Sequence, residues 1–130
     1  MGQRLAGKVA IVSGGATGCG AAAVRLFVAE GAAVGIIDRN ARDGQALAFE
    51  LALAGKRVVF AAADVSKKAE VDAAVANIAA SLGPVNVLFN HAGTIVIKPF
   101  LDTTEAEWDW LHAVNVKSMF LVTKIGRAHV

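Results

Sequence analysis

Short apolar runs alternate with longer amphipathic stretches along almost the whole chain. The short runs are rich in valine, isoleucine and alanine, which is typical of parallel strands that are buried on both faces. They predict four β-strands, over Val9–Ser13, Ala33–Asp38, Arg57–Ala62 and Val85–Asn90.

The stretches between these runs predict helices. The first three cover Cys19–Glu30, Ala41–Ala54, and the residues from an N-cap at Ser66 to about Leu82. They are ended by Gly31, Gly55 and Gly83-Pro84. The first helix places Ala22, Leu26 and Ala29 on one face. A last helix begins after a cap at Thr103 or Thr104, and it carries Trp108, Leu111, Val114 and Met119.

The order of these elements predicts an α/β fold. Repeated β-α-β units with short connections imply right-handed crossovers and a parallel sheet. We therefore expect a Rossmann-like, doubly wound sheet with the strand order 3-2-1-4. Ligands of such sheets bind in the crevice where the strand order reverses, here between the first and fourth strands.

Composition narrows the class of protein further. The chain has 130 residues, enough for one domain or less, and 55% of them are hydrophobic. No apolar stretch reaches the roughly 18 residues of a membrane span, so we expect no membrane association. The net charge of +2 is scattered, which argues against nucleic-acid binding. The single cysteine, Cys19, permits no internal disulfide and fits the cytoplasm. We expect no metal site.

Three spaced glycines between the first strand and the first helix predict a nucleotide site. Gly14 allows a tight turn, Gly18 lets the backbone approach a phosphate, and Gly20 lets the helix pack closely on the strand. A pyrophosphate then lies at the helix N-terminus. Glycines also mark ordinary turns, but the strand and helix on either side supply the context that the motif requires.

Asp38 ends the second strand, about 20 residues beyond the glycines, where a carboxylate can accept hydrogen bonds from an adenosine ribose. It would also repel a 2′-phosphate. Arg39 could instead pair with that phosphate. We expect the cofactor to be NAD, with NADP as the alternative, because the carboxylate occupies the strand end itself.

Four segments together resemble the short-chain dehydrogenase/reductase family. Ser13-Gly-Gly-Ala-Thr-Gly-Cys-Gly20 is similar to its Thr-Gly-x-x-x-Gly-x-Gly signature, and Asn90-His-Ala-Gly93 is similar to its Asn-Asn-Ala-Gly motif. Asp64-Val65 resembles its adenine-binding pair, and Asn115 aligns with its structural and catalytic asparagine. The resemblance runs from Leu5 to about Lys124.

The resemblance implies roles for these residues. The cofactor-binding set is Ser13, Gly14, Thr17, Gly18, Gly20, Asp38, Arg39, Asp64, Val65, Asn90, Ala92 and Gly93. Asn115 is implied as catalytic, acting through backbone and a water that passes protons toward a lysine. Each position also has a purely structural alternative: Asp64 could simply be a residue on the approach to the next helix, and Asn90 could simply form hydrogen bonds with backbone groups where the strand ends. His91 replaces the second asparagine of the motif, and the family gives it no role.

The resemblance further implies an oxidoreductase that transfers a hydride between NAD and an alcohol or ketone, or reduces a 3-oxoacyl group, as a homodimer or homotetramer. Its chemistry needs a serine and a Tyr-x-x-x-Lys pair after the next strand. This chain has no tyrosine. We therefore expect the chain to be an incomplete, inactive N-terminal part of such an enzyme. The alternative is a non-catalytic dinucleotide-binding module.

The last six residues depart from the resemblance. Ile125-Gly-Arg-Ala-His-Val130 breaks the amphipathic pattern and matches the translation of a common sequencing adapter. We expect residues 1–124 to belong to the dinucleotide-binding domain and residues 125–130 to be non-native.

Overall fold

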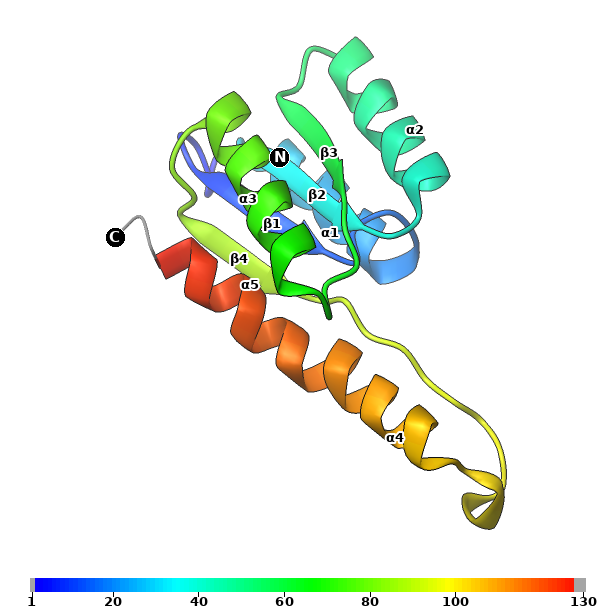
Figure 1. The fold of residues 1–130 in the computed structure, drawn as a ribbon. Helices are drawn as coiled ribbons and strands as arrows, with labels where there is room; N and C mark the ends of the chain where they lie inside the picture. The colour runs from blue at the N-terminus through cyan, green and yellow to red at the C-terminus, as the bar shows by residue number, and fades with distance from the viewer. Residues whose placement is uncertain (1, 128–130) are drawn as a thin grey trace.

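The computed structural model describes residues 2–127, and the side chains of residues 2–124. Its centre is a parallel sheet of four strands in the order β3-β2-β1-β4, as the sequence predicted (Figure 1). The strands are β1 (Val9–Ser13), β2 (Ala33–Asp38), β3 (Val58–Ala62) and β4 (Val87–Asn90). β1 and β2 have the predicted bounds, whereas β4 begins two residues later than expected.

Within the described residues, five α-helices connect and follow the strands. They are α1 (Gly18–Ala29), α2 (Ala41–Leu53), α3 (Lys68–Leu82), α4 (Glu105–His112) and α5 (Ser118–Arg127). The last predicted helix is therefore two helices, and a π-helical segment, Ala113–Lys117, joins them. None of the helices in the described residues is long and apolar enough to cross a membrane.

The sheet separates two apolar cores. On one face, Val24 and Val28 of α1 and Leu47 of α2 pack on the strands. On the other face, Val75 of α3 and Leu121 of α5 do the same. β1 and β2 are buried between the two layers of helices, which explains why their sequences are continuously apolar, whereas the residues of the edge strand β4 are half-buried or exposed.

One local prediction, the cap of α3, was wrong, and the face of α1 that carries Leu26 is not the buried one. In α1 the buried residues are Gly20, Val24 and Val28, whereas Leu26 is 43% exposed. Ser66 does not cap α3, because Lys67 is the N-cap and the Ser66 hydroxyl donates instead to a carboxylate oxygen of Asp64, at 2.6 Å.

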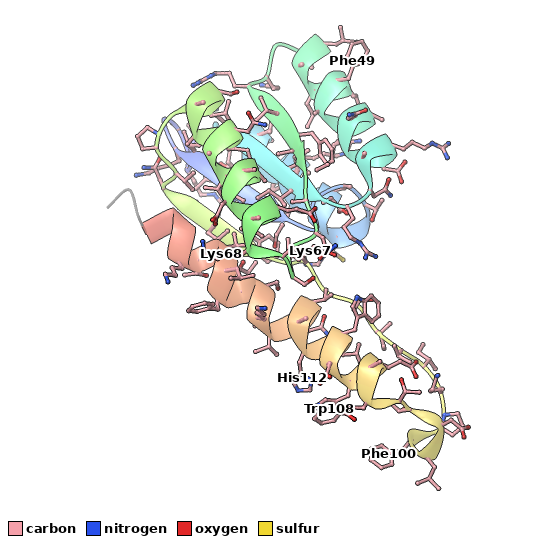
Figure 2. The ribbon with its side chains drawn as sticks, viewed as in Figure 1. Phe49, Lys67, Lys68, Phe100, Trp108 and His112 are labelled. Atoms are coloured by element: carbon pink, nitrogen blue, oxygen red, sulfur yellow. The ribbon has the colours of Figure 1, made fainter. Side chains whose placement is uncertain are left out.

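The segment from α4 to α5 is one long helical rod. Figure 1 shows α5 beside the sheet and α4 extending away from it. The Thr104 side chain caps α4, and Glu107 completes a capping box. Aromatic side chains are exposed on the rod and on the short 3-10 helix before it, Phe100–Asp102, among them Trp108 and Phe100 (Figure 2). The predicted non-native tail lies partly outside the described residues: α5 continues to Arg127, and residues 128–130 are not described.

Candidate cofactor site

A cleft of about 390 Å³ lies at the carboxyl ends of the strands. The segments that follow all four strands contribute to its walls, and the end of α4 and the π-helical segment form a further wall. It lies at the reversal of the strand order, as the sequence predicted for a ligand site. Its lining residues are Gly14, Thr17, Gly18, Cys19, Ile37, Asp38, Arg39, Ala63, Asp64, Val65, His91, Ala92, Gly93, Thr94, Trp110 and Val114.

The N-terminus of α1 faces this cleft. Thr17 is its N-cap, but the Thr17 side chain makes no capping hydrogen bond, and the first turn carries no acidic residue. The first backbone N–H groups of a helix have no partner within the helix, and the helix dipole adds positive potential there. Gly18 has φ +56° and no atom near a Cβ position, so the backbone itself forms the surface. This end of the cleft is suited to an anion such as a phosphate.

Gly14 allows two loops to approach closely. Its φ is +70°, and a Cβ there would lie 2.8 Å from the Ala92 Cα. Ser13 stabilises the same approach of the two loops, because its hydroxyl oxygen accepts hydrogen bonds from the backbone N–H groups of His91 and Ala92, both at 3.1 Å. Ser13 is only 2% exposed and does not line the cleft.

Gly20 also lies behind the cleft. It is buried, and a Cβ there would overlap the Gly14 carbonyl oxygen and lie 2.9 Å from the His91 ring. The side-chain-free surface of Gly20 therefore lets α1 approach the loop after β1. Of the three glycines, Gly14 and Gly18 face the cleft and Gly20 supports them.

Asp38 is held at the end of β2 by backbone hydrogen bonds. One carboxylate oxygen accepts from the Ala16 N–H at 3.1 Å, and the other accepts from the Asn40 N–H at 3.0 Å. Each carboxylate oxygen retains a lone pair that can accept a further hydrogen bond. Arg39 follows with an exposed side chain that also lines the cleft. A fixed negative charge and an adjacent positive charge thus share this wall.

Asp64 and Val65 form the wall that follows β3. One Asp64 carboxylate oxygen accepts from the Ser66 N–H at 3.0 Å and from the Ser66 hydroxyl. Burial acts to raise the pKa of Asp64, but these hydrogen bonds and the charges of Arg39 and Lys67 outweigh it, so the pKa lies below its ordinary value. Asp64 is therefore an ionised acceptor at neutral pH.

The two asparagines of the predicted site, Asn90 and Asn115, lie beside the cleft and not on its surface. The Asn90 amide donates to the Thr123 hydroxyl of α5 at 3.0 Å. The Asn115 side chain pairs with the backbone of Thr94: its oxygen accepts from the Thr94 N–H at 2.7 Å, and its amide donates to the Thr94 carbonyl at 2.9 Å. Asn115 lies within the π-helical segment, so this pair anchors the rod to the loop that follows β4.

Comparison with known proteins identifies the family. Residues 8–129 match the family described as short chain dehydrogenase. The chain belongs to the short-chain dehydrogenase family. It is 43% identical over 121 residues to a 3-alpha-(or 20-beta)-hydroxysteroid dehydrogenase of Mycobacterium tuberculosis, a match that covers 93% of this chain and 45% of that protein. It is 40% identical over 129 residues to a 3-beta-hydroxysteroid dehydrogenase of Comamonas testosteroni, covering 98% and 49%.

A solved structure agrees with this assignment. The blue fluorescent protein from a metagenomic library, in complex with NADPH, matches with a TM-score of 0.90 and 36% identity, over 97% of this chain and 52% of that one. The chain spans about half the length of the curated relatives that it matches.

The residues present fit the nicotinamide dinucleotide that short-chain dehydrogenases bind. The uncovered backbone at Gly18 suits the pyrophosphate, since a side chain there would occupy the space that a phosphate needs. Fixed carboxylates at Asp38 and Asp64 supply acceptors on the neighbouring walls. Within the described residues, no three side chains of His, Cys, Asp or Glu gather closely enough to hold a metal ion.

Sequence reasoning missed several lining residues of this short-chain dehydrogenase cleft. Ile37, Ala63 and Thr94 are sequence neighbours of predicted residues, and this adjacency could have revealed them. Cys19 and His91 were given no binding role, although both face the cleft. Trp110 and Val114 carry no local signal, because the position of α4 depends on the tertiary pair between Asn115 and Thr94.

Proposed function

We propose that this chain is the cofactor-binding part of an NAD-dependent dehydrogenase that interconverts a secondary alcohol and a ketone. The observation that carries the proposal is the cleft at the strand ends, in which the α1 N-terminus and the Asp38 carboxylate face a common space. The matched relatives named as hydroxysteroid, cyclopentanol and D-threitol dehydrogenases support this substrate class.

In this proposal each wall has a separate task. The backbone at Gly14, Gly18 and the Thr17 hydroxyl bind the pyrophosphate. Asp38 accepts hydrogen bonds from the adenosine ribose, and Asp64 with the Val65 backbone holds the adenine. The bound dinucleotide supplies or accepts the hydride.

The segment after β4 has the other task. Ala92 and Gly93, with little side chain, let the nicotinamide ribose approach, and Ser13 and Asn90 keep their loop in place. Asn115 orients the same loop through Thr94. Its proposed part in proton transfer requires partners that the short-chain dehydrogenase family supplies from a later segment.

Asp38 favours NAD over NADP. A 2′-phosphate would approach a carboxylate that two backbone N–H groups hold in place. Two charges about 4 Å apart near a protein surface interact by up to a few kcal/mol before salt screening. We therefore expect NAD to bind about 10-fold more tightly than NADP, despite the neighbouring Arg39.

Calorimetric titration of the chain with NAD and NADP tests the proposal. Asp38→Asn removes the charge and keeps the shape, so the preference for NAD should fall several-fold. Asp102→Asn is the matched control, because Asp102 is exposed and lies outside the cleft. Failure of both dinucleotides to bind a folded chain contradicts the proposed site, and tighter binding of NADP contradicts the role of Asp38.

We also propose that the chain alone has no dehydrogenase activity, because none of its 130 residues is the tyrosine that the family uses as its acid. Incubation of the pure chain with NAD and a panel of secondary alcohols should give no NADH absorbance. NADH formation by this chain would overturn that expectation. NAD binding together with no activity in any longer gene product would instead favour a non-catalytic dinucleotide module.

A further inference from the structure

One aromatic side chain of the cleft has no part in the proposed function. Trp110 lies on the last turn of α4, and Val114 lies one turn later in the π-helical segment. Both line the cleft; the Trp110 residue is 36% exposed, and Val114 is buried. A large flat ring beside a small apolar side chain forms a surface suited to a planar, partly apolar ligand group.

The arrangement of α3 and α5 locates this surface along the cleft. The two helices pack against each other, and both begin near the end of the sheet at which the strands terminate (Figure 1). The loop that leads into α3 carries Asp64 and Val65, and Figure 2 shows Lys67 and Lys68 at the end of α3 that lies nearest the rod. The residues just before α5 therefore lie at the end of the cleft that Asp64 and Val65 form.

We propose that the Trp110 indole packs against the adenine of the bound dinucleotide and is a binding determinant for that base. This inference rests on the proposed function, because it assigns the base end of the same site. Val65 and Ala63 are both buried, which gives this end of the cleft an apolar wall besides Trp110. Bases stack on aromatic side chains whatever their hydrogen-bonding edge, so Trp110 adds affinity for the base while Asp64 supplies a polar contact.

The chain offers a matched control in its other tryptophan. Trp108 lies on the same helix but does not line the cleft, and its ring stacks on His112 with centroids 4.5 Å apart (Figure 2). The sequence contains only these two tryptophans. In a Trp108→Phe variant, Trp110 is therefore the sole source of tryptophan fluorescence.

The experiment compares ligands with and without a base. ADP and inorganic pyrophosphate are titrated into the Trp108→Phe chain, with fluorescence excited at a wavelength that only tryptophan absorbs. ADP should quench the emission to saturation, and pyrophosphate should leave it nearly unchanged. By calorimetry, Trp110→Leu should weaken ADP binding about 10-fold, near the lower end of what base stacking contributes, because Trp110 is partly exposed. Pyrophosphate affinity should stay within twofold.

The outcomes separate this inference from the proposed function. If ADP binds the Trp108→Phe chain by calorimetry but leaves its fluorescence unchanged, and Trp110→Leu binds ADP normally, the role of Trp110 is refuted while the site stands. If neither ADP nor NAD binds any folded variant, both proposals fail. Equal losses of ADP and pyrophosphate affinity in Trp110→Leu would mean a general distortion of the cleft, and they would also overturn the assignment to adenine. Circular dichroism confirms that each variant is folded.

Discussion

Replacing Ser13 by alanine should destabilise the fold by removing a buried hydrogen-bond acceptor. The buried hydroxyl oxygen accepts hydrogen bonds from the N–H groups of His91 and Ala92, at 3.1 Å each. Alanine removes the acceptor and leaves the Ala92 N–H without a protein partner, whereas the His91 N–H still donates to the Phe89 carbonyl oxygen at 3.0 Å. An unsatisfied buried donor costs about 1–3 kcal/mol. Ala92 is half-buried, so water compensates in part, and we expect a loss of about 1–2 kcal/mol in the free energy of unfolding.

Urea unfolding followed by circular dichroism measures this loss. The midpoint should fall while the slope with denaturant stays constant, because the change in exposed surface on unfolding is the same. Ser13→Thr is the matched control: it keeps the hydroxyl, threonine is the residue of the family signature at this position, and the variant should be less destabilised than Ser13→Ala. Ser13→Ala should also weaken ADP binding, because the His91–Gly93 loop lines the cleft. A Ser13→Ala variant within about 0.5 kcal/mol of the original chain would refute the reasoning.

Three further outcomes can be measured on the same chain. Gly14→Ala should cost more than about 2 kcal/mol and abolish ADP binding, because it combines a positive φ with a clash, whereas Gly55→Ala, with φ +81° and open space around it, should cost about 1 kcal/mol and leave binding intact. Maleimide labelling of Cys19, which is exposed in the cleft, should slow about 10-fold at an ADP concentration ten times its Kd, and an unchanged rate would contradict the site. Hydrogen bonds from Arg4 hold the pKa of Glu30 below its ordinary value, so the ion pair stabilises the fold fully above the ordinary pKa, and this stabilisation is lost as the pH falls through the lowered pKa. Arg4→Gln should therefore flatten the pH dependence of the free energy of unfolding between about pH 5 and pH 3, and an unaltered pH dependence would exclude the Arg4–Glu30 pair as its source.

The strands and the glycine loop could be predicted because their signals are local. Val9–Ser13 and Ala33–Asp38 are apolar runs with polar neighbours, and a strand buried on both faces needs nothing more. Gly14 and Gly18 follow directly from a strand and a helix start, so their position at the cleft depends only on nearby residues.

The features that could not be predicted depend on tertiary contacts, or on helix faces that differ little in apolar area. Alanines at several successive positions of α1 differ little in apolar area, so the sequence did not distinguish the face of Val24 from that of Leu26. The Ser66 hydroxyl donates to the Asp64 carboxylate and does not cap α3, which begins at Lys68. Trp110 reaches the cleft because the Asn115 pair orients the rod, and helical periodicity does not encode that orientation.

The π-helical segment also allows one stripe of the rod to serve two neighbours. Positions four residues apart drift around a regular α-helix by roughly 40° at each step. Over the three steps from Trp110 through Val114 and Ser118 to Val122, that drift would turn the stripe by about a third of a revolution. The wider π turn takes back part of this rotation, so Trp110 and Val114 face the cleft while Ser118 and Val122 are buried against the body of the protein. The irregular turn thus makes a single helical surface continuous from the ligand site to the apolar core.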